Sequence, residues 1–186
     1  MEQVMIITIA RQCGCQGDEI GLRLAQEYGL KLYNKEHIIK FAKEKNIYDK
    51  FPYFFSEIPV NALMHTISDD EGNILLTESK KALYPLIGDE NCVIIGRCAN
   101  YAFSDRQDKV SIFLSGDKTA RIRHISQKHN ITEKKAKIVV DETDSRRREF
   151  HKYCSNQEWG NAAYYDLCID CLLYTSDAAD ERSSVD

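Results

Sequence analysis

The sequence predicts an α/β protein with a parallel β-sheet and helices on both of its faces. Three apolar runs rich in β-branched residues have the composition of strands buried on both sides, namely residues 4–10 (VMIITIA), 92–96 (CVIIG) and 109–116 (KVSIFLSG). Segments with helical spacing of apolar residues separate these runs. Strands that alternate with helices favour a parallel sheet, because each parallel connection needs a crossover segment.

The remaining elements can be placed in order along the chain. We expect strands over 4–10, 30–34, 92–96, 109–116 and 164–170. Helices are expected over 17–29, 35–45, 74–87, 117–130 and 131–153. The helix over 74–87 should end near Pro85, and the longer polar helix over 131–153 should have Thr132 as its N-cap. The apolar side of the first helix is predicted to consist of Ile20, Leu22, Leu24 and Ala25.

Two connecting segments leave alternatives open. Residues 51–59 (FPYFFSEIP) combine two prolines with an aromatic cluster, which is typical either of a lid-like segment or of a packed connection. Residues 69–72 (DDEG) are typical of a solvated acidic turn, and a metal site there is the less favoured alternative.

Composition places the chain among ordinary globular proteins. It has 186 residues, 43% hydrophobic and 29% charged, which suits one compact domain. The net charge of -4 argues against broad nucleic-acid binding, and no apolar run reaches the length of a membrane span. The seven cysteines lack the spacing of a disulfide framework or a zinc site, and the start of the chain has no signal-peptide pattern. We therefore expect reduced thiols, a cytoplasmic location, and no nucleic-acid or membrane partner.

The loop after the first strand has the outline of a phosphate-binding loop. Such loops curl backbone N–H groups around phosphate oxygens at a helix N-terminus, and Gly14 and Gly17 permit such a curl, while Gly21 allows close packing of the helix on a strand. The P-loop pattern G-x-x-x-x-G-K-[ST] fails, however, because Gly17 stands where the lysine belongs. From the loop alone, phosphate binding and a purely structural turn remain alternatives.

Two acidic residues follow this loop. Asp18 and Glu19 suit the first turn of a helix, where the helix dipole favours negative charge, and for Asp18 this is the preferred role. Glu19 lies where a P-loop carries its magnesium-binding hydroxyl, so we consider it a candidate Mg²⁺ contact, direct or through water.

Five segments in order resemble the cytidylate kinase-like family, a branch of the P-loop nucleoside monophosphate kinases that lacks the P-loop lysine. They are residues 7–38 (from ITIARQCGCQGDEIG), 92–103 (CVIIGRCANYAF), 120–137, 141–153 (DETDSRRREFHKY) and 159–170 (WGNAAYYDLCID). The resemblance covers roughly residues 4–170. It implies a three-layer P-loop NTPase-type parallel sheet with helices on both faces and a helical lid at about 117–153. Gln16 replaces a usual glycine and Asp18 a common basic residue.

The resemblance also implies an activity and its site. It implies transfer of a phosphoryl group from ATP, with Mg²⁺, to CMP, dCMP or a similar small acceptor. The residues implied to hold ATP are Arg11, Cys13, Gly14, Cys15, Gln16, Gly17, Asp18 and Glu19.

Four further residues are the candidate catalytic groups. Arg97, at a strand end, is expected to grip the phosphate of the acceptor, an ion pair being its alternative role. Arg121 is preferred to Arg123, which lies on the other side of the same helix. Asp144 is expected to orient Arg147 toward the phosphates when the lid closes, although pairs of Asp144 with Arg147 or Arg148 also fit surface ion pairs. Arg11 is a further candidate to supply the charge of the missing lysine.

The function and the extent of the domain have alternatives. A nucleotide-binding or regulatory protein with little catalysis is favoured by Gln16 and Asp18, and a kinase for another small acceptor is a third option. We expect one domain over 1–170, and a non-native or disordered tail over 171–186. Residues 171–180 (CLLYTSDAAD) resemble a translated sequencing-library adapter, which favours a non-native origin.

Overall fold

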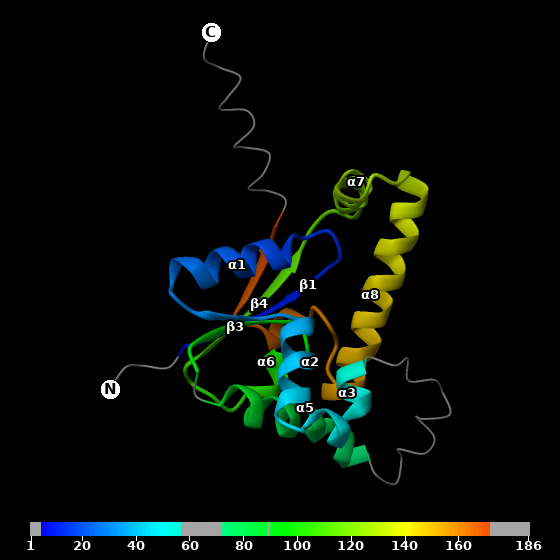
Figure 1. Cartoon of the computed structure of the whole chain (residues 1–186). Coiled ribbons are helices and arrows are strands. Elements are labelled where there is room, and N and C mark those ends of the chain that lie inside the picture. Colours follow the sequence, from blue (N-terminus) through cyan, green and yellow to red (C-terminus); the bar gives the residue numbers. More distant parts are fainter. Residues whose placement is uncertain (1–4, 57–71, 89, 172–186) are drawn as a thin grey trace.

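A five-stranded parallel sheet forms the centre of the described part of the chain (Figure 1). The computed structural model describes residues 5–56, 72–88 and 90–171. The strands lie in the order β2-β3-β1-β4-β5, with bounds β1 (Ile6–Arg11), β2 (Lys31–Tyr33), β3 (Cys92–Ile95), β4 (Lys109–Ser115) and β5 (Leu167–Asp170). All four pairings between neighbouring strands are parallel, which confirms the predicted fold class.

Helices cover both faces of this sheet (Figure 1). Their bounds are α1 (Gly17–Glu27), α2 (Lys35–Glu44), α3 (Pro52–Ser56), α5 (Gly72–Ile87), α6 (Ala99–Ala102), α7 (Lys118–His129) and α8 (Glu133–Ser155), with 3₁₀ turns η1 (Tyr48–Lys50) and η2 (Ala162–Tyr164). The helix α1 packs on one face, whereas α2, α3, α5, α6 and the C-terminal end of α8 pack on the other.

Alternation along β1 builds these two cores. Ile7 and Ile9 face α1, whereas Ile6 faces the aromatic core that contains Phe54, Phe55 and Phe103. Close packing on the α1 side requires a glycine, because a Cβ on Gly21 would lie 2.7 Å from Cδ1 of Ile95. The predicted role of Gly21 is therefore confirmed.

Side-chain caps fix where several helices begin. The side chains of Asn34, Asp117 and Thr132 accept hydrogen bonds from backbone N–H groups in the first turns of α2, α7 and α8. The Thr132 cap was predicted and is confirmed. In contrast, Gln16 makes no side-chain cap at the start of α1. The first amide groups of α1 thus have no acceptor within the helix or from its N-cap side chain.

Several local predictions differ from the structure. Leu22 was assigned to the apolar side of α1 but is 46% exposed, because it lies about 200° around the helix from Ile20. The helix α5 begins at Gly72, two residues earlier than predicted, and ends at Ile87 as the predicted range did. Pro85 lies inside its last turn, and Gly88 N–H still reaches Tyr84 O at 2.8 Å. The last strand begins at Leu167, three residues later than predicted.

The segment at 51–56 is a packed connection, because Phe54 and Phe55 are fully buried there. Residues 57–59, the acidic residues 69–71, Val4 and the tail over 172–186 lie outside the described residues. All seven cysteines are free thiols. None of the helices in the described ranges has the length and apolar character that crossing a bilayer requires.

Candidate active site

The carboxyl ends of β1 and β3 border a cavity of about 150 Å³. These two strands are neighbours, but the chain leaves them toward opposite faces, through α1 after β1 and through α6 after β3. Ligands of open α/β sheets bind where such connections diverge. The cavity is lined by Thr8, Ile9, Ala10, Arg11, Lys35, Ile95, Gly96, Arg97, Cys98, Asn100, Arg146, Arg147, Phe150, His151 and Trp159, and we call it the cation cavity.

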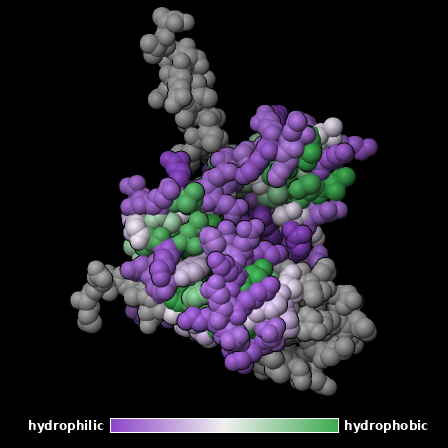
Figure 2. All heavy atoms as spheres, viewed as in Figure 1, coloured by the Kyte–Doolittle hydropathy of each residue, from purple (hydrophilic) through white to green (hydrophobic). Residues whose placement is uncertain are grey.

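Positive charge dominates this cavity. Five of its lining residues are cationic, and no aspartate or glutamate occurs among the described residues that line it. Arg11, Arg97 and Arg147 were predicted site residues, whereas Lys35 and Arg146 were missed. Both had a signal in the sequence, since Lys35 directly follows the strand predicted over 30–34 and Arg146 precedes Arg147. On the face seen in Figure 2, hydrophilic residues predominate between α8 and the sheet.

The loop that joins β1 to α1 (residues 12–16, the glycine loop) contains two left-handed residues. Gly14 has a φ of 92°, and a Cβ there would lie 2.8 Å from Arg121 O, so only glycine fits. Gln16 has a φ of 52°, a conformation that costs a non-glycine residue about 1 kcal/mol. The predicted backbone restriction at Gln16 is therefore visible as a strained N-cap position.

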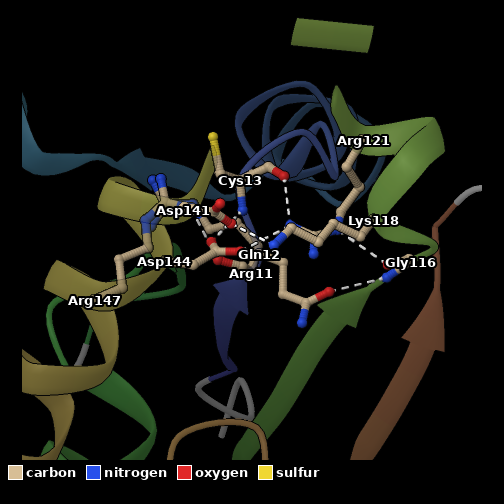
Figure 3. A network of polar contacts seen from close by, with 9 residues as sticks. All are labelled: Arg11, Gln12, Cys13, Gly116, Lys118, Arg121, Asp141, Asp144 and Arg147. Atoms are coloured by element: carbon tan, nitrogen blue, oxygen red, sulfur yellow. Dashed lines mark hydrogen bonds and ion pairs between the residues drawn. The ribbon is translucent and has the colours of Figure 1, made fainter. Parts of the chain in front are cut away.

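A buried ion pair holds this loop in place (Figure 3). Asp144 Oδ1 accepts the N–H of Cys13 at 2.7 Å, and Arg121 Nη1 donates to Cys13 O at 3.0 Å. Arg121 Nη1 also lies 2.7 Å from Asp144 Oδ2, and its Nε donates to Gly116 O at 3.0 Å. The pair therefore binds both backbone polar groups of Cys13 and joins α7 and α8 to the loop.

The predicted partnership of Asp144 with Arg147 is wrong. Asp144 is buried, so its carboxylate needs a close cation, and Arg121 from α7 supplies it. Arg147 instead donates from Nη1 to Arg11 O at 3.0 Å, from the same side of α8 (Figure 3). Arg148 lies over the ring of Trp159, and Arg123 is exposed, as the preference for Arg121 implied.

The side chain of Arg11 occupies the space where the missing lysine would start. A Cβ on Gly17 would lie 2.6 Å from Arg11 Cγ, and one on Gly96 would lie 2.6 Å from Arg11 Nη1. The guanidinium thus passes from the start of α1 to the end of β3, and its Nη2 is 3.6 Å from Asp18 Oδ1. Gly17 and Arg11 are sterically coupled, because any side chain at position 17 displaces Arg11.

Arg97 lines the cavity but is anchored to α3. Its Nη1 and Nη2 donate to Phe54 O at 2.6 Å and to Phe55 O at 3.1 Å. The guanidinium also lies 5.9 Å from the centre of the Phe54 ring and 5.7 Å from that of Phe150. Arg97 therefore fixes α3 against the cavity wall, and its role toward a phosphate stays a prediction.

The loop thiols are neutral, and Glu19 is paired with a lysine. The pKa of Cys13 is raised by burial, and that of Cys15 by a hydrogen bond to Cys171, so both stay neutral. Glu19 forms an ion pair with Lys128 at 2.6 Å. Within the described ranges, no three His, Cys, Asp or Glu residues form a group able to hold a metal. A Mg²⁺ contact of Glu19 stays a prediction.

Cys98 and His151 form a buried pair beside the cations. Cys98 Sγ lies 3.4 Å from His151 Nδ1. Burial raises the pKa of Cys98 to about 12 and lowers that of His151 to about 4, so both are uncharged at neutral pH. Neither residue was singled out from the sequence.

Comparisons with known proteins place these observations in a family. The sheet order, the loop between β1 and α1, and the helical layers define a P-loop NTPase-type α/β fold. The profile of the Cytidylate kinase-like family matches residues 6–171, and the chain belongs to that family. Among curated proteins, none matches the chain significantly.

Solved structures are similar over most of the chain. An uncharacterized protein from Eubacterium ventriosum ATCC 27560 has 28% identity and a TM-score of 0.64, with 98% of this chain and 99% of that chain covered. A shikimate kinase from Bacteroides thetaiotaomicron has 10% identity and a TM-score of 0.46, with 97% and 99% covered. A gluconokinase from Sinorhizobium meliloti 1021 has 13% identity and a TM-score of 0.44, with 77% and 76% covered.

Loss of one partner of the buried ion pair should destabilise the protein strongly. Arg121→Met leaves Asp144 buried without its cation, and we expect the free energy of unfolding in urea to fall by about 3–5 kcal/mol. The double variant Arg121→Met/Asp144→Leu should recover most of this loss. Lys118→Met breaks the exposed α7–α8 pair with Asp141 and serves as the control, with an expected cost below about 1 kcal/mol. Equal losses for the two single variants would contradict the assigned role of burial.

Acid should destabilise the protein through His151. Its pKa in the folded state, about 4, lies below the unfolded value of 6.5, so the unfolded state binds the proton first as pH falls. The contribution to stability is fully present above about pH 6.5, declines toward pH 4, and amounts to roughly 3 kcal/mol. Chemical unfolding across this range should show a shallower decline for His151→Gln than for the original chain. Parallel profiles would show that His151 is not buried in its neutral form.

Proposed function

We propose that the protein transfers a phosphoryl group from ATP to a nucleoside monophosphate, with CMP and dCMP as the first candidate acceptors. The observation that carries this proposal is the cation cavity at the carboxyl edge of the sheet, where five cationic side chains and no carboxylate occur among the described lining residues. Membership of the Cytidylate kinase-like family supports a kinase-like function. A cavity of this kind attracts the dianionic phosphate of a small acceptor.

The proposal places the phosphates of ATP and the phosphate of the acceptor in two separate anion sites. In the proposal, the uncapped first turn of α1 holds the phosphates of ATP through backbone N–H groups, as helix N-termini do. Arg147, with Arg146 and Lys35, holds the phosphate of the acceptor in the cavity. Arg11 lies between the two sites, beside Gly17 and Gly96, where charge develops on the transferred group.

Arg11 takes over the role of the P-loop lysine in this proposal. Its aliphatic part packs beside Gly17 and its guanidinium beside Gly96, where neither glycine carries a side chain that would displace it. Mg²⁺ bound to ATP would neutralise part of the phosphate charge. Asp18 and Glu19 are the acidic residues that follow the loop in the first turn of α1. A contact of Glu19 with Mg²⁺ would require release of its ion pair with Lys128.

The predicted lid corresponds to α7 and α8. Arg121 and Asp144 link both helices to the glycine loop, and Arg146 and Arg147 lie two and three residues beyond Asp144 on α8. We propose that closure rotates α8 about the buried pair and brings these arginines onto bound phosphates. The buried pair then acts as the pivot of that motion.

A nucleotide-binding protein with little catalysis is the second candidate. Two observations favour it, namely the strained Gln16 in the loop and the use of Arg97 as an anchor for α3. The deciding experiment incubates the purified chain with Mg·ATP and CMP, dCMP, UMP, AMP or non-nucleotide acceptors, and detects ADP and phosphorylated acceptor. We expect a diphosphate product from a pyrimidine monophosphate. Binding of ATP without product from any acceptor would establish the second candidate. Product from a non-nucleotide acceptor alone would establish a kinase for another small acceptor.

Exchange of charge between positions 11 and 17 tests the role of Arg11. Arg11→Ala should lower kcat/KM by about 10²-fold, the usual cost of losing one group that stabilises transition-state charge. Arg11→Ala/Gly17→Lys should regain about tenfold, because removal of Arg11 frees the space in which a lysine side chain can start. Arg23→Ala on the exposed side of α1 is the matched control and should leave kcat/KM unchanged. A kcat/KM of the double variant no higher than that of Arg11→Ala would refute the proposal that Arg11 replaces the P-loop lysine.

A further inference from the structure

Two buried polar atoms without a hydrogen-bond partner among the described residues belong to side chains that line the cation cavity. They are Thr8 Oγ1, on β1, and His151 Nε2, on α8. Both residues line the cavity, and both are almost fully buried, at 1% and 3% exposure. Buried hydroxyl and imidazole groups without partners are costly, so each such group needs an explanation.

The fold places these two atoms on the same side of the sheet. Residues alternate along β1, so Thr8 faces away from Ile7 and Ile9 and toward the side on which α6 and the end of α8 pack. His151 lies on α8, where its Nδ1 is held 3.4 Å from Cys98 Sγ, which leaves Nε2 as its second hydrogen-bonding atom. Two side chains with hydrogen-bonding groups, from distant parts of the chain, therefore line the same cavity.

These groups differ in charge from the rest of the cavity. Burial keeps His151 neutral at physiological pH, because it lowers the pKa to about 4, and the threonine hydroxyl carries no charge. Arg11, Arg146 and Arg147 are suited to phosphate oxygens, whereas a neutral imidazole and a hydroxyl are suited to an uncharged polar group. Cavities of about 150 Å³ accept one six-membered ring, so there is room for a single pentose or pyrimidine ring.

We propose that Thr8 and His151 form a neutral recognition subsite that hydrogen-bonds an uncharged polar group of the acceptor, supplied by its sugar hydroxyls or by its base. This inference rests on the proposed function and deepens it, because it makes the acceptor a phosphomonoester with a polar ring rather than a bare phosphate. The cations hold the phosphate, and the subsite selects the sugar or base attached to it.

Matched variants separate recognition from packing. Thr8→Val and His151→Phe keep the approximate shape but remove the hydrogen-bonding atom, whereas Thr8→Ser and His151→Gln retain one. Calorimetric titration without ATP measures the Kd of CMP, dCMP, ribose 5-phosphate and inorganic phosphate for each chain. Thr8→Val and His151→Phe should each weaken CMP binding about tenfold and change inorganic phosphate binding less than about twofold. The serine and glutamine variants should stay within about threefold of the original chain.

The ligand series identifies which part of the acceptor is read. A similar loss of affinity for CMP and ribose 5-phosphate supports recognition of the sugar. A smaller loss of affinity for dCMP points to the 2′-hydroxyl. Loss for CMP and dCMP alone supports recognition of the base. Equal loss for inorganic phosphate, or no loss for any ligand, would overturn the inference, since the two atoms would then act on the phosphate or bind only water.

Stability provides a second readout. Thr8→Val removes an unpartnered buried polar atom and should leave the melting temperature unchanged or raise it, while binding falls. His151→Phe also removes Nδ1, which contacts Cys98 Sγ, so the melting temperature is read from Thr8→Val. A packing role alone would lower the melting temperature in step with all binding. CMP binding that shows the expected discrimination without CDP formation would refute the transfer reaction but not the subsite. Normal CDP formation with an unchanged KM for CMP in Thr8→Val and His151→Phe would refute the subsite alone.

Discussion

The ion pair between Arg121 and Asp144 determines where the glycine loop lies relative to the helices around it. It binds the N–H and the C=O of Cys13, so the loop cannot move without breaking a buried charge pair. Because Asp144 lies on α8, the same contact fixes the helix that carries Arg146, Arg147 and His151. The shape of the cavity therefore depends on one residue, Cys13, whose backbone is held by two helices far from it in sequence.

Charge is distributed unevenly over this protein. The whole chain has a net charge of -4, yet the charged residues in the described lining of the cavity are all cationic. Like charges held together repel, so an empty cavity of this kind is less stable than one that contains an anion. Asp18, at 3.6 Å from Arg11, offsets part of this repulsion from the rim. The arrangement is preorganised for a negative ligand, with the energetic cost met during folding.

Sequence reasoning succeeded where one local pattern determines one structure. Apolar β-branched runs predicted the buried strands, and Thr132 predicted the start of α8. It failed where two distant segments compete for one group. The spacing of Asp144 and Arg147 permits an i,i+3 pair, but only the packing of α7 on α8 shows that Arg121 reaches the carboxylate first. Likewise, nothing local to Arg97 indicated that carbonyl groups of α3 would bind it.

The steric coupling of Arg11 and Gly17 constrains how such a loop can evolve. A lysine acquired at position 17 first would collide with the arginine, and an arginine lost first would leave this spot without its cation. Each single substitution is thus unfavourable although the pair of substitutions is compatible. Conversion between a lysine-bearing and a lysine-free loop therefore requires substitutions at positions 11 and 17 together.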